Sequence, residues 1–170
     1  MPKSDPAKLV RVSVSLPFGM GKAEWESDPA ERRAAWCLYV ELITRVAVQA
    51  IPGDCWLFRE ALDSLYSLFE STRIVLKDGG PDLGRSKQSV AGIAIGVLNV
   101  GLRPFLSRWH PSLSSWETSR RPEVSQLEHE RQWTDISEFK SQFQTLRGEL
   151  SKYADALAAI AGIDSAISGI

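Results

Sequence analysis

Hydrophobic and polar residues alternate in one stretch near the N-terminus. In residues 9–16 the apolar residues Val10, Val12, Val14 and Leu16 are separated by arginine and serine. A period of two over eight residues predicts a β-strand with one buried face. No second stretch with this alternation stands out, so the sequence predicts an N-terminal arm over residues 1–25 with a single short strand. Such a strand must pair with an unrecognised strand or another subunit, or lie extended across helices.

The remaining chain, residues 26–165, shows the three-to-four-residue spacing of apolar positions that is typical of amphipathic helices. Four long segments carry this spacing, at about residues 29–51, 54–77, 89–103 and 125–161. Pro104 and Pro111 interrupt the pattern after the third segment, where we expect a kink followed by short helical pieces. The predicted fold class is all-α: an antiparallel up-down bundle of four main helices with a kinked third helix and an extended N-terminal arm.

Capping signals support the helix boundaries. Asp28 precedes Pro29, and Asp54 precedes the second helical segment, so each is a candidate N-cap. Ser125-x-x-Glu128 has the spacing of a capping box, in which each side chain bonds a free backbone N–H at the helix start. Gly162 is the candidate stop of the last helix.

Composition describes an ordinary folded domain. The 170 residues are 44% hydrophobic and 24% charged, with a formal net charge of -1. A nucleic-acid partner is not expected, because such proteins need a basic excess. The longest apolar stretch, residues 90–102, is shorter than the roughly 18 residues of a membrane span and predicts a buried helix. Without a recognisable signal segment, and with Cys37 and Cys55 taken as core thiols, we expect a cytoplasmic protein.

The sequence carries few motifs for catalysis. It has no phosphate-binding glycine loop, no C-x-x-C pair and no H-x-x-x-H pair, so we predict no cofactor, no metal site and no catalytic residues. One exception is Cys55, which follows Asp54 at a predicted helix start, where a thiol pKa can fall. If His110 approached Cys55, the pair would resemble a nucleophile and its base, which makes a Cys-dependent enzyme the third functional hypothesis.

Several polar residues stand on otherwise apolar helices. Glu41 and Arg45 are four residues apart on the first helix, as are Asn99 and Arg103 on the third, and Arg73 lies near the end of the second. If these helices pack together, the five side chains can form a buried network of carboxylate, guanidinium and amide groups. Such a network either fixes the register between helices or lines a pocket for an anion.

Aromatic, arginine and proline residues are concentrated in residues 103–117. Besides Arg103, the candidate partner-binding residues here are Arg108, Trp109, His110 and Trp116. Tryptophan and arginine are enriched where proteins bind one another. The structural alternative is a tryptophan-pinned corner that closes the bundle.

We therefore predict a non-catalytic interaction module of the bacterial cytosolic type, such as an adaptor, a regulator or an accessory subunit. It would bind a protein partner or form a homo-oligomer through the N-terminal strand and residues 103–117. The second hypothesis is a helical sensor that binds a small anionic ligand between helices near Arg45 and Arg103.

Overall fold

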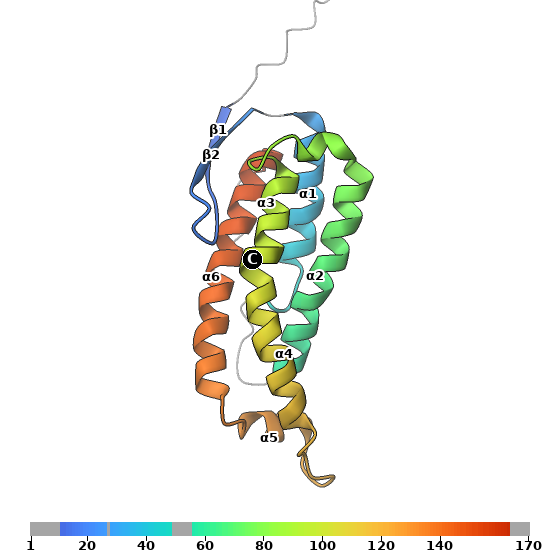
Figure 1. Ribbon diagram of the computed structural model, residues 1–170, viewed down its shortest axis with the longest axis vertical. Helices are drawn as coiled ribbons and strands as arrows, with labels where there is room; N and C mark the ends of the chain where they lie inside the picture. The colour runs from blue at the N-terminus through green and yellow to red at the C-terminus, as the bar shows by residue number, and fades with distance from the viewer. Residues whose placement is uncertain (1–10, 27, 49–55, 164–170) are drawn as a thin grey trace, which may run out of the picture.

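The computed structural model describes residues 11–26, 28–48 and 56–163. It is mostly helical, with 70% helix and 7% strand. A two-stranded hairpin precedes the helices (Figure 1). In chain order the elements are β1 (Arg11–Ser15), β2 (Lys22–Glu26), α1 (Pro29–Ile43), α2 (Phe58–Gly79), the 3-10 turn η1 (Pro81–Gly84), α3 (Val90–Gly96), the π-helical segment η2 (Val97–Leu102), α4 (Arg103–Glu117), α5 (Gln126–Arg131) and α6 (Ile136–Ala161).

The predicted strand is present as β1, but the expectation of a single strand is wrong. β1 pairs antiparallel with β2, so that Val14 lies opposite Ala23. Ala23 and Trp25 are buried, whereas the three charged residues of β2 are exposed. This alternation was missed because a small alanine and a lone tryptophan among charges resemble a polar loop. The indole N–H of Trp25 donates to Glu31 on α1 at 2.6 Å, which ties the hairpin to the helices.

The loop of the hairpin rests on two glycines of the third helix. An added Cβ at Gly101 would lie 2.4 Å from the ring of Phe18, and one at Gly96 would lie 2.7 Å from the sulfur of Met20. Phe18 adopts a left-handed backbone conformation (φ 54°), and its N–H donates to the carboxylate of Glu149 on α6. The absence of side chains at Gly96 and Gly101 therefore lets the large side chains of Met20 and Phe18 pack directly against the third helix.

The third helix does not end at Pro104. Helical structure is continuous from Val90 to Glu117, through both Pro104 and Pro111. In a regular α-helix the Pro104 ring would clash with the carbonyl of Val100. The π-helical segment η2 lies at this point, where its wider turn relieves that contact. The short helical pieces predicted after Pro104 are therefore a single helix, α4.

The fourth predicted helix is divided in two. Ser125 caps α5 as predicted and accepts from the N–H of Glu128 at 3.2 Å. Between α5 and α6 the chain turns so that Trp133 is buried at 2% exposure. Gly162 ends α6 with φ 74°, as its position predicted. The amphipathic pattern runs through this break because the turn keeps Trp133 on the buried side.

The boundaries around the first two helices also differ from the prediction. α1 ends at Ile43 and is followed by turns, while α2 begins at Phe58. Leu57 occupies the N-cap position of α2 and makes no side-chain capping bond. The predicted cap Asp54 and the neighbouring Cys55 lie outside the described residues.

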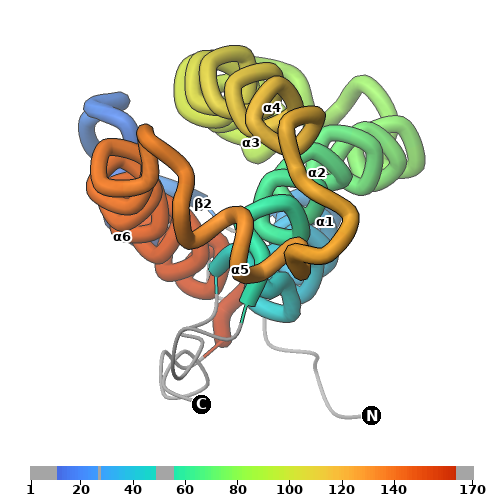
Figure 2. The backbone as a smooth tube through the Cα atoms, turned by 90° about the horizontal axis from the view of Figure 1, so that it is seen from below, coloured from blue at the N-terminus to red at the C-terminus, as the bar shows by residue number. Residues whose placement is uncertain are grey.

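The all-α expectation holds in its coarse form, whereas a regular up-down four-helix bundle is not confirmed. α1 packs between α2 and α6, and α4 packs against α2 (Figure 2). Aromatic rings fill the space between α4 and α6, with the ring centroids of Trp109 and Phe139 5.4 Å apart.

One helical stretch, Val90–Glu117, is long and apolar enough to cross a bilayer by length and composition alone. Half of its most apolar window is buried inside the molecule.

Candidate functional site

Polar groups of α2 and α4 meet at the end of the molecule that α5 covers, which we call the sealed end. Arg59 donates two hydrogen bonds to Glu117, at 2.9 and 2.7 Å, and a third to Ser114 at 3.0 Å. His110 Nε2 lies 3.1 Å from a guanidinium nitrogen of Arg59. The hydrogen bond to Glu117 raises the pKa of Arg59, so the guanidinium stays charged in this half-buried position.

Glu130 completes the sealed end from α5. It is 1% exposed and accepts from the backbone N–H groups of Phe58 (2.6 Å) and Arg59 (3.3 Å). The carboxylate thereby caps α2, which Leu57 cannot do. Burial raises the pKa of Glu130, against the opposing effect of the two backbone hydrogen bonds. Sequence reasoning missed this contact because no local spacing connects residues so far apart in the chain.

Aromatic packing secures the same end of the molecule. Trp109, a candidate partner-binding residue, is 1% exposed and meets Trp133 edge-on with centroids 5.6 Å apart. Trp116 stacks on His129 at 4.8 Å and donates its indole N–H to the His129 carbonyl. Arg108 is exposed, lies over the ring of Trp109 and pairs with a glutamate of α6. Both tryptophans therefore occupy the corner that the structural alternative described.

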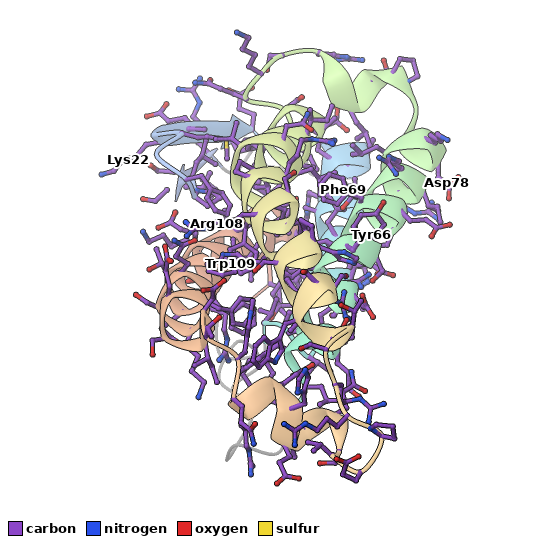
Figure 3. All side chains as sticks on the ribbon, turned by 60° about the horizontal axis from the view of Figure 1, so that its bottom comes forward. Lys22, Tyr66, Phe69, Asp78, Arg108 and Trp109 are labelled. Carbon is purple, nitrogen blue, oxygen red and sulfur yellow. The ribbon has the colours of Figure 1, made fainter. Side chains whose placement is uncertain are left out.

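Further along the same two helices lies a groove of about 800 Å³, which we call the open groove. Figure 3 shows Tyr66 and Phe69 of α2 on the side that faces α4. Three of the sequence candidates line the groove, namely Arg73, Arg103 and His110. The full lining is Asp63, Tyr66, Ser67, Phe69, Glu70, Arg73, Ile74, Lys77, Arg103, Leu106, Ser107 and His110.

One end of the open groove is basic. The guanidinium groups of Arg103 and Arg73 lie 5.2 and 5.7 Å from the centroid of the Phe69 ring, and Lys77 stands one turn beyond Arg73. Arg103 also donates twice to the neutral amide oxygen of Asn99. Within the described residues no ion pair joins a carboxylate to any of these three cations.

The middle of the open groove is apolar, and its far end is polar. Tyr66, between Asp63 and Phe69, is 63% exposed, and Ile74, between Arg73 and Lys77, is 53% exposed. At the far end His110 Nε2 lies 3.7 Å from Asp63 Oδ1, and the His110 ring is 6.0 Å from that of Tyr66. Along α2 the groove thus runs from Asp63, past Tyr66, Phe69 and Glu70, to a basic end where Ile74 stands between Arg73 and Lys77. The cations of that end have no acidic partner among the described residues.

The predicted polar network is divided between two places. Arg45 bonds Glu41 at 2.7 Å and also reaches the Ser64 carbonyl and the hydroxyls of Ser67 and Ser71 on α2. These bonds join the end of α1 to α2 and leave the Arg45 side chain 15% exposed. Arg45 does not line the open groove, so it is not grouped with Arg103 there.

The residues that the structure describes form no assembled site for metal binding or for thiol chemistry. No group of three or more metal-ligating side chains occurs among those residues. Cys37 is a half-buried free thiol on α1. Cys55, which the third hypothesis would pair with His110, lies outside the described residues. His110 contacts Arg59.

No protein-family model, no curated protein and no solved structure matches the chain.

Proposed function

We propose that the protein is a non-catalytic interaction module that binds a segment of a protein partner in the open groove. The observation that carries the proposal is that Arg73, Lys77 and Arg103, which have no acidic partner among the described residues, stand beside the exposed side chains Tyr66 and Ile74. Exposed apolar side chains beside charged groups that lack an oppositely charged neighbour are typical of binding surfaces. Arginine and tyrosine are also among the residues that contribute most to binding energy.

Only part of the surface predicted from sequence enters this proposal. Arg103 and His110 are retained from residues 103–117, because they line the groove. The N-terminal strand is left out, since β1 has its partner in β2 and no longer needs another chain. An adaptor or regulatory subunit in the cytoplasm is the role that we infer for such a module.

Site-specific photo-crosslinking in cells tests this proposal. A photoreactive residue placed at Tyr66 should give adducts with a discrete partner, and the double substitution Arg73→Glu and Arg103→Glu should abolish them. The same photoreactive residue at Thr145, exposed on α6, is the matched control and should not give those adducts. Adducts that survive the charge reversal, or that also form at Thr145, would contradict a groove-directed partner.

A small anionic ligand is the second candidate function, and the same three cations favour it. Because Arg45 does not line the open groove, this reading now depends on Arg73, Lys77 and Arg103. Thermal unfolding with inorganic phosphate and with citrate separates the two readings. A saturable stabilisation that Arg103→Gln removes and Tyr66→Ala leaves intact would favour the small anion. Binding of a partner segment that packs on the Tyr66 ring should instead be lost in Tyr66→Ala as well as in Arg103→Gln.

A further inference from the structure

Both walls of the open groove are helices, which restricts what can lie in it. The backbone N–H and C=O groups in the interior of α2 and α4 are bonded within their own helix, except that Pro111 has no N–H to donate to the carbonyl of Ser107. An extended segment in the groove would therefore find few backbone partners along these walls, and burying its own N–H and C=O groups would cost free energy. A helical segment satisfies its backbone internally and needs only side-chain contacts.

The charge distribution along the groove specifies the polarity of the occupant. Arg73, Lys77 and Arg103 form one end, and Asp63 with His110 forms the other. Acidic side chains at one end of an incoming helix would complete three charge pairs that the described chain leaves open. Among the described residues that line the groove, Glu70 is the one carboxylate between the two ends, and it is exposed.

The middle of the groove specifies the buried face of the occupant. Phe69 and Leu106 are buried and Tyr66 is exposed beside them, while Ile74 is exposed next to Arg73, where the basic end begins. Apolar side chains spaced by three and four residues would cover these rings and methyl groups from one face of a helix. From Asp63 to Lys77 the wall of α2 extends about 21 Å, at 1.5 Å per residue, which corresponds to roughly four helical turns.

From these three features, we infer that the occupant of the open groove is an amphipathic α-helix of a protein partner, with acidic residues at the end that meets Arg73, Lys77 and Arg103. This inference rests on the proposed function and names its partner class. In this complex the partner's carboxylates pair with the three cations, and one apolar stripe of the partner helix covers the apolar side chains of the groove.

Selection from a displayed library of random 16-residue peptides tests the inference. The full chain is the target, and the double variant Arg73→Glu and Arg103→Glu removes binders that do not need the basic end. Lys87→Glu with Arg121→Glu makes the same change in net charge at exposed sites outside the groove and serves as the control target. The expected selected sequences have acidic residues at one end, apolar residues at helical spacing and no proline between them.

A synthetic peptide from the selected class then gives the magnitude. Replacing its terminal acids by glutamine should weaken binding about tenfold. Placing proline in its centre should weaken binding about a hundredfold, because proline disrupts a helix interior. Proline-rich or strictly alternating sequences, sequences without acids, or no enrichment at all would overturn the helical acidic occupant.

The failure of this inference can be told apart from the failure of the proposed function. Groove-dependent adducts at Tyr66 together with extended or basic selected sequences would keep a protein partner and reject the acidic helix. Absence of those adducts would reject the proposed function, whatever the library contains.

Discussion

The sealed end and the open groove are built from the same two helices, yet their polar residues are used in different ways. At the sealed end Arg59 finds a carboxylate, a hydroxyl and an imidazole, and Glu130 caps the first turn of α2. In the open groove Arg73 and Arg103 lie against one aromatic ring and have no carboxylate within the described chain. An arginine among apolar residues can therefore serve either the fold or a partner, depending on what faces it.

The boundary between the two regions falls at His110. Its imidazole contacts Arg59 on the sealed side, and it also lines the open groove. After His110 on α4, Ser114 and Glu117 bond Arg59, whereas Arg103, Leu106 and Ser107 before it line the open groove. Substitutions that are matched across this boundary should separate stability from binding.

The largest expected difference in the free energy of unfolding is between alanine substitutions of two aromatic residues. Trp109→Ala should lower the free energy of unfolding by about 3–5 kcal/mol, because it empties a buried site between α4 and α6. Tyr66→Ala should change it by about 0.5 kcal/mol or less, since the ring is already mostly in water. Urea denaturation of both variants measures the difference, and similar losses would show that the groove belongs to the core.

A smaller difference is expected between two arginines. Arg59→Ala should cost about 1.5–3 kcal/mol, because it leaves Glu117 half-buried without its donors. Arg73→Ala should be nearly neutral, with a change of about 0.5 kcal/mol or less. Thermal unfolding under one set of conditions compares the two. If Arg73→Ala destabilises as strongly as Arg59→Ala, Arg73 has a structural partner and the comparison fails.

The smallest expected effect is on the pH dependence of stability. Burial in the folded protein raises the pKa of Glu130. The contribution of this shift to the free energy of unfolding is therefore fully present at acid pH and is lost as pH rises through the folded pKa. Between about pH 4 and 7, wild type should lose stability relative to Glu130→Gln, whose side chain does not titrate. Denaturation curves of both proteins across this range give the difference directly. A constant difference, or one that rises with pH, would contradict the assignment.

Sequence reasoning succeeded where local patterns determine the structure. The alternation around Val12 predicted β1, and the spacing of Ser125 and Glu128 predicted the start of α5. Apolar periodicity correctly indicated a mostly helical protein. Each of these signals lies within a few residues and reflects the geometry of one strand or one helix.

The rest depended on contacts between distant residues. Pro104 indicated a break, but the π-helical segment before it allows the helix to continue. Nothing near Glu130 shows that it caps α2, and nothing near Arg45 shows that it bonds the serines of α2 instead of joining Arg103. Sequence could propose Arg73, Arg103 and His110 as candidates, but only the packing of α2 on α4 brings them to one groove.

The π-helical segment also sets the rotational phase of everything that follows it. Each residue of an α-helix turns the chain by about 100°, so an added or lost residue rotates all later side chains by that angle. Residues 97–102 precede Trp109, which must face the core, and Arg103, which must face the groove. A one-residue deletion within this segment would turn both away together. The length of this segment thus sets which face of α4 meets the core and which meets the groove.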